Sequence, residues 1–168
     1  NKSHSVTAQV IVPEKGAEGV IIAQGANIGG WSLYAKAGKL KYCYNWGGFR
    51  HFMVESSSAI PAGDHQVRME FTYDGGGLGK GGTAALFIDG KPVGKGRIDA
   101  TLASVFSADD GLDLGEDTGA PVSPDYGSEG NRFNGQVKAV QLAIAEAAES
   151  LDHLVDPQLA IQMAMARQ

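Results

Sequence analysis

Residues 64–97 constrain the fold of this chain more than any other stretch. Between residues 65 and 73 every second side chain faces a common apolar side, namely His65, Val67, Met69, Phe71 and Tyr73. A period of two over this length predicts a strand with one buried face. Residues 83–88 are apolar on both faces and lead into Asp89-Gly90, a dipeptide typical of a type I′ hairpin turn. With a return strand at 92–97, the stretch predicts three consecutive antiparallel strands, the second of them central.

Similar patterns predict strands on both sides of this stretch. The expected strands cover residues 5–13, 18–24, 31–36, 40–45, 50–55, 101–107 and 133–145. Residues 108–131 form a long irregular segment rich in Asp, Gly and Pro, and loops of this length are often functional. Many short strands at close spacing predict an all-β fold, a sandwich or a barrel.

Composition narrows the class of protein. The 168 residues suffice for one domain with a real core, and the 24 glycines are scattered between strand-like runs, as in a turn-rich sandwich. A net charge of −5 without a basic stripe argues against nucleic acid as a partner. No apolar run approaches the roughly 20 residues of a membrane span.

The single cysteine excludes an internal disulfide and leaves the compartment, periplasmic or cytoplasmic, unassigned. The chain starts without Met, so we expect an excised domain of a longer protein.

The character of the chain changes near its end. Asp156-Pro157 is an N-cap followed by proline at the first helical position. Apolar side chains then recur at helical spacing, at Leu159, Ala160, Met163 and Ala164. The sequence therefore predicts a β-sandwich over 1–145 and a tail over 146–168 with a short C-terminal helix, packed on the sandwich or on a neighbouring domain.

A glycine-rich loop at residues 74–82 contains one cation, Lys80. The loop lacks the Gly and the Ser or Thr that a Walker loop requires, and a strand rather than a helix follows it, which argues against nucleotide binding. A long hairpin loop whose glycines permit positive φ is one interpretation. The other is that Lys80 sits on a flexible arm and faces an anionic ligand or a neighbouring active site.

Five carboxylates lie close together in the first part of the irregular segment, Asp109, Asp110, Asp113, Glu116 and Asp117. Calcium takes six to eight hard oxygen ligands, so a structural calcium site is one hypothesis for this segment. The spacing does not fit an EF-hand, and the alternative is a solvated acidic loop.

Aromatic residues cluster between Trp31 and Phe49. Such rings fill the cores of sandwiches, but exposed rings also stack on sugars. Trp46, in a loop with Gly47, Gly48 and Phe49, is the best candidate for an exposed ring, and Trp46 and Phe49 are the candidate sugar contacts. Cys43 and His65 fit packing roles better than catalytic ones.

Two sets of residues carry a family resemblance. Residues 29–34 and 38–45 resemble the central strands of laminin-G or concanavalin A-like jelly rolls. Residues 65–97, 106–126 and 152–168 together resemble the C-terminal region of bacterial arylsulfatases, the large formylglycine-dependent sulfatases. The resemblance implies an antiparallel jelly-roll sandwich and, as partner, the catalytic sulfatase domain of the same chain, which would use formylglycine and calcium or magnesium.

The same resemblance argues that this piece is not itself an enzyme. The sulfatase motif C/S-x-P-x-R is absent, because no proline has Cys or Ser two residues before it, and the E-x-D-x-E strand of jelly-roll glucanases is absent too. We therefore expect a non-catalytic accessory domain of an arylsulfatase, with Lys80 near the mouth of the active site. The alternative is a lectin-like carbohydrate-binding module for which a sulfated glycan is a candidate ligand. A purely structural or dimerising domain is a third interpretation.

Overall fold

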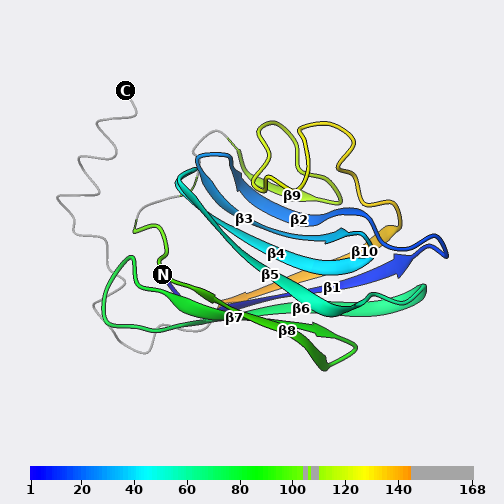
Figure 1. Cartoon of the computed structure of the whole chain (residues 1–168), viewed down its shortest axis with the longest axis horizontal. Coiled ribbons are helices and arrows are strands. Elements are labelled where there is room, and N and C mark those ends of the chain that lie inside the picture. The colour runs from blue at the N-terminus through cyan, green and yellow to red at the C-terminus, as the bar shows by residue number, and fades with distance from the viewer. Residues whose placement is uncertain (104–105, 107–109, 145–168) are drawn as a thin grey trace.

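The computed structural model describes residues 1–103, 106 and 110–144, and it shows two antiparallel sheets stacked face to face (Figure 1). Sheet A has the strand order β10-β1-β6-β7-β8, and sheet B has the order β5-β4-β3-β2-β9. The strands are β1 (His4–Val12), β2 (Gly19–Ala26), β3 (Gly29–Lys36), β4 (Lys39–Trp46), β5 (Arg50–Ala59), β6 (Gly63–Tyr73), β7 (Gly82–Ile88), β8 (Lys91–Ile98), β9 (Leu112–Leu114) and β10 (Gln136–Ile144). The predicted all-β sandwich is confirmed.

The core lies between the two sheets and follows the alternation of the strands. Sheet A contributes the inward side chains of β1, β6 and β7, among them Val10, Met69 and Leu86. Sheet B contributes larger groups, because Trp31, Leu33, Leu40 and Tyr42 all point inward from β3 and β4. Each strand therefore fixes its register by keeping its apolar set on the buried face.

The three predicted consecutive strands pair as expected, with β7 between β6 and β8. Asp89 and Gly90 have φ values of 49° and 75°, as a type I′ turn requires. β7 is fully buried on one face, and its outer residues Ala85 and Phe87 are half-buried. The guanidinium of Arg68 covers the ring of Phe87 at 5.0 Å, which explains an apolar residue on an outer face.

Other predicted boundaries differ from the structure. The expected strand at 101–107 does not form at 101–103, and the strand expected to start at 133 starts at Gln136. The three-residue β9 lies inside the segment that we expected to be irregular throughout. The predicted tail over 146–168, with its C-terminal helix, lies entirely outside the described residues. In the part of the chain that is described, no helix is long and apolar enough to cross a membrane.

A second, smaller core lies on the outer face of sheet B. Val20, Tyr34 and Cys43 point outward from β2, β3 and β4, and Val122 packs against them together with Tyr126. The irregular segment thus covers this face, and its hydrogen bonds support the packing: Tyr34 donates to Asp125 at 2.7 Å. Sheet B is covered on both faces, which explains why its central strands β2 and β3 are almost entirely buried.

Candidate functional site

Several connections gather at one end of the sandwich, on the left of Figure 1. They are the β2–β3 turn, the β4–β5 turn and the β6–β7 glycine loop, next to the N-terminal residues of the described chain. Loops at the end of a rigid sandwich are a common place for binding residues. All three of the predicted ligand candidates, Lys80, Trp46 and Phe49, lie at this end.

Asn45, the last buried residue of β4 before the turn, holds two of these turns together. Its side-chain amide donates to the backbone oxygens of Ala26 and Asn27 in the β2–β3 turn and of Val122 in the segment over sheet B. Its Oδ1 accepts from the backbone N–H of Gly48 at 2.7 Å. Asn45 is fully buried, so one side chain fixes the path of both turns.

The β4–β5 turn presents two aromatic rings. Phe49 is 88% exposed and Trp46 is 36% exposed, with ring centroids 6.3 Å apart. Ile28 of the neighbouring β2–β3 turn is 61% exposed, and its backbone lies beside Gly48. We call Ile28, Trp46 and Phe49 the aromatic rim. The most exposed ring is Phe49 rather than Trp46, because the Trp46 indole N–H is turned inward to the backbone oxygen of Thr101.

Thr101 links the aromatic rim to the glycine loop. Its backbone oxygen accepts from Trp46 at 3.3 Å, and its hydroxyl and N–H both donate to the backbone oxygen of Lys80. The Lys80 N–H in turn donates to the hydroxyl of Tyr73. The backbone at Lys80 is therefore anchored on both sides, unlike the flexible arm considered from the sequence, while its side chain is exposed.

The charges around the rim differ in how they are neutralised. Arg50 pairs with Asp99 at 2.8 Å, and Arg97 pairs with Asp74 beside the glycine loop. Within the described residues, the ammonium of Lys80 forms no ion pair and no hydrogen bond. This cation is thus available to an anionic group outside the chain.

The carboxylates of the predicted calcium segment have other partners. Asp113 accepts from the N–H and hydroxyl of Thr118, and Glu116 pairs with Arg132 at 3.0 Å. Asp117 is buried, and its Oδ2 accepts from Tyr126 and from the backbone of Val122. Among the described residues no three His, Cys, Asp or Glu side chains form a group that could hold a metal ion. Asp109 lies outside the described residues, and calcium binding stays a prediction.

Cys43 and His65 have structural surroundings. Burial in the outer core of sheet B raises the pKa of the Cys43 thiol to about 12, so the thiolate nucleophile is suppressed. His65 is half-buried on β6, and its Nδ1 lies 2.7 Å from Asp89, which raises the pKa of the imidazole. This pair belongs to the β7–β8 turn, at the opposite end of β7 from the rim.

Sequence reasoning found the exposed rings but missed the residues that position them. Asn45 was expected at the end of a strand, although an Asn two residues before the Gly47-Gly48 pair fits the start of a turn. Thr101 lay in an expected strand, and no local pattern marks its contact with Lys80, which is 21 residues away in the sequence. Contacts over such separations depend on the topology of the sheets.

The comparisons with known proteins concern the fold. No protein-family model matches the chain, and no curated protein sequence matches it significantly. Among solved structures, domains LG4-5 of the mouse laminin α1 chain align over 86% of this chain, with a TM-score of 0.55 and 14% identity. The CBM40 module of a Ruminococcus gnavus IT-sialidase, solved with α2,3-sialyllactose, aligns over 84% with a TM-score of 0.56 and 14% identity. The binding domain of botulinum neurotoxin serotype C1 aligns over 99%, with a TM-score of 0.54 and 13% identity.

The fold is a laminin-G-like jelly roll. At identities of 13–14% the likeness shows the architecture alone. The aligned region covers 37% of the laminin chain, 37% of the toxin chain and 76% of the CBM40 chain. Nothing in these comparisons links the chain to arylsulfatases. The structures are named as a carbohydrate-binding module, a toxin binding domain and laminin domains, which are not names of catalytic domains.

Proposed function

We propose that this chain is a non-catalytic glycan-binding module that uses the aromatic rim and Lys80. One observation carries the proposal: Thr101 joins a solvent-exposed pair of rings to a cation that has no partner among the described residues. A sugar ring presents an apolar face that stacks on an aromatic ring, whereas its charged substituents attract an ammonium group. The solved complex of the similarly folded CBM40 module with a sialylated glycan supports the proposal by analogy of fold.

The geometry favours an acidic glycan, with a sulfate or carboxylate group as the ligand of Lys80. Arg50 at the edge of the rim is occupied by Asp99, whereas the Lys80 ammonium has no ion-pair partner among the described residues and is the cation that we assign to the ligand anion. An exposed cation of this kind adds selectivity and salt dependence more than raw affinity. We expect a sulfated oligosaccharide to bind more tightly than its desulfated form, and the difference to shrink at high salt.

Titration of the chain with a sulfated oligosaccharide and its desulfated form, followed by calorimetry, tests the proposal. We expect Phe49→Ala to weaken the binding of both about tenfold, which corresponds to about 1.4 kcal/mol. Lys80→Ala should weaken only the sulfated ligand. The matched controls are Leu114→Ala, another exposed apolar residue, and Lys91→Ala, an exposed lysine beyond the far turn of β7. Equal effects in the variants and the controls would rule out this site.

The sulfatase relationship is a second proposal, and it rests on the sequence resemblance of three separate stretches. In that case the parent protein hydrolyses sulfate esters, and Lys80 faces the mouth of its active site. We expect Lys80→Ala in the full enzyme to raise KM for a sulfate ester, because a cation at the mouth attracts the substrate anion. A full-length protein without sulfatase activity would remove this proposal and leave the glycan-binding proposal in place.

A further inference from the structure

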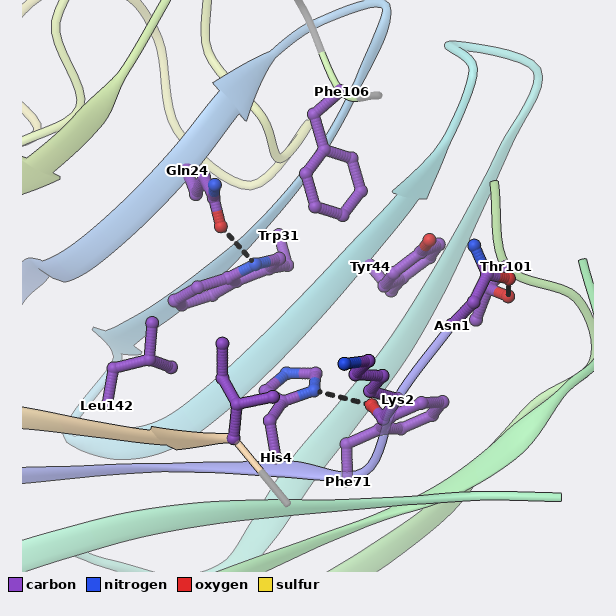
Figure 2. Close-up of a pocket in the computed structure, with 11 residues that line it drawn as sticks. Asn1, Lys2, His4, Gln24, Trp31, Tyr44, Phe71, Thr101, Phe106 and Leu142 are labelled. Carbon is purple, nitrogen blue, oxygen red and sulfur yellow. Dashed lines mark hydrogen bonds between the residues drawn. The ribbon is translucent and has the colours of Figure 1, made fainter. Parts of the chain in front are cut away.

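A cavity of about 190 Å³ opens between the two sheets at the same end of the sandwich. Figure 2 shows its aromatic walls: Trp31 and Tyr44 from sheet B, Phe71 from sheet A, and Phe106 from the connection that crosses between them. Leu142 and Ile144 from the end of β10 complete the lining. Thr101 belongs both to this lining and to the support of the aromatic rim, but the rim residues themselves do not line the cavity.

Among the buried side-chain nitrogen and oxygen atoms of the wall, all but one have a hydrogen-bond partner among the described residues. The indole N–H of Trp31 donates to Gln24 at 2.9 Å, and Tyr44 accepts from the backbone of Leu102. The side chain of Asn1 bonds to Leu102, Gly79 and Thr101. His4 is the exception, because its Nε2 is buried and has no hydrogen-bond partner among the described residues.

Whether His4 Nε2 carries a proton follows from the hydrogen bond that Nδ1, the other ring nitrogen, makes. His4 Nδ1 lies 3.1 Å from the backbone oxygen of Lys2, as the dashed line in Figure 2 shows. A carbonyl oxygen only accepts, so Nδ1 carries the proton and Nε2 of the neutral ring is a bare acceptor. Burial lowers the pKa of His4, which keeps the ring neutral at pH 7. The ring also packs between Trp31 and Phe71, with centroid distances of 6.1 and 5.4 Å.

We propose that this cavity binds a small aromatic ligand with one hydroxyl group, which donates its hydrogen bond to Nε2 of His4. The size fits a single ring, since a cavity of about 150 Å³ in another protein holds benzene. The walls offer aromatic and aliphatic carbon to the ring, and His4 Nε2 is the one buried side-chain polar atom in the described lining that lacks a partner, which a donor would supply. An unpaired buried acceptor is costly, so a donor is preferred to a methyl group at that place. The proposal does not rest on the proposed glycan site, although the two sites share Thr101.

Phenol and toluene are matched probes, because they differ only in a hydroxyl against a methyl group. The intact chain carrying Trp46→Phe has Trp31 as its sole tryptophan. The indole ¹H–¹⁵N resonance of Trp31 then reports binding directly. We expect both probes to shift this resonance in the millimolar range, and phenol alone to shift the ¹⁵N resonance of His4 Nε2.

Variants separate the hydrogen bond from simple apolar binding. His4→Phe keeps a ring but removes the acceptor, so the preference for phenol over toluene should fall about fivefold, as expected for one hydrogen bond. Leu142→Phe should narrow the cavity and weaken the binding of both probes while Trp31 stays the sole tryptophan, whereas Leu114→Phe, on the edge strand β9, should not.

Three outcomes would overturn the proposal. The first is that neither probe shifts Trp31 in the intact chain. The second is an unchanged preference for phenol in His4→Phe. The third is binding only after the chain is shortened to end at Ile144, because the cavity would then belong to the chain's own C-terminal segment.

Discussion

Asn45 is the residue on which the geometry of the rim depends most. Its four hydrogen bonds connect two turns and the segment over sheet B, and all of them are lost in Asn45→Ala. Because Asn45 itself and its partners Ala26 and Val122 are buried, we expect the free energy of unfolding to fall by about 2–4 kcal/mol. Urea denaturation measures this change, and the loosened turn should also lower glycan affinity.

Asn134→Ala is the matched control for that prediction. Asn134 also bonds to backbone groups, the N–H of Glu18 and the oxygen of Gly16, but its side chain is exposed. Water can replace those bonds, so the cost should stay near 1 kcal/mol or below. Similar losses in the two variants would contradict the special role of Asn45.

Asp117 and Asp125 should affect stability with opposite dependence on pH. Burial raises the pKa of Asp117, against hydrogen bonds from Tyr126 and Val122, and the charges of Asp113 and Asp110 raise it further. The folded state therefore holds the proton more tightly than the unfolded state, and ionisation of Asp117 lowers stability as pH rises from about 4 through the raised value. The stability of the wild type relative to Asp117→Asn should then increase when the pH is lowered.

Asp125 provides the comparison. Burial works to raise its pKa, but the hydrogen bonds from Lys41 and Tyr34 and the charge of Lys41 outweigh burial and lower it. Its contribution to stability is present above about pH 4 and is lost as the pH falls through the lowered value. Relative to Asp125→Asn, the wild type should lose stability in acid. Urea denaturation between pH 3 and pH 7 measures both differences, and slopes of the same sign would refute the assignment.

At the level of single elements, Gly90 in the β7–β8 turn isolates the effect of backbone conformation. A Cβ on Gly90 would meet no atom within 4 Å, yet its φ is 75°. Gly90→Ala should therefore destabilise the protein by about 1–2 kcal/mol through strain in the left-handed region. Gly111→Ala is the control, because Gly111 also has open space around it but no such φ. Thermal unfolding distinguishes the two, and equal melting temperatures would show that the turn relaxes at no cost.

The strands were predictable to the extent that they are half-buried. In β1 and β6 buried and more exposed residues alternate, because one face of each strand packs on the core and the other faces water. The sequence shows this as an alternation of apolar and polar residues. β9 lacks an alternation that matches burial, because its apolar residues Leu112 and Leu114 are exposed on an edge strand. The second core was missed as well, since Val122 and Tyr126 pack through a loop that has no period.

The candidate site was predictable only in part. Trp46 and Phe49 stood out because Gly-Gly between two rings marks a turn, and turns are exposed. Lys80 was identified because it is the one cation in the glycine-rich loop at residues 74–82. Their common support at Thr101 was not predictable, because it requires the order of strands in two different sheets.

At the scale of the whole molecule, the single cysteine can report how readily the irregular segment opens from the outer face of sheet B. We call this part of the segment, around Val122 and Tyr126, the cover. Cys43 is buried beneath Val122, and its thiol pKa of about 12 leaves about one part in ten thousand as thiolate at pH 8. Modification by a disulfide reagent should therefore be slower than that of a free thiol by at least a thousandfold. We expect Val122→Ala to accelerate it strongly, because the cover then opens locally.

Val67→Ala makes the same chemical change in the main core between the sheets. Both variants should lose stability by about 1–3 kcal/mol. Only opening of the cover exposes Cys43 without global unfolding, so the reaction should be faster in Val122→Ala than in Val67→Ala at equal loss of stability. Equal rates would mean that the cover and the sandwich open together.

The position of β1 between β6 and β10 determines when sheet A can be completed during synthesis of the chain. During translation β1 leaves the ribosome before the other strands of this sandwich, but one of its two neighbours, β10, starts at Gln136. His4 meets Ile144 only when nearly the whole sandwich has been synthesised. Until then the nascent chain carries an unpaired edge on its oldest strand. Sheet A must therefore close late, and pauses in translation before residue 136 would lengthen the period in which chains can pair with one another instead.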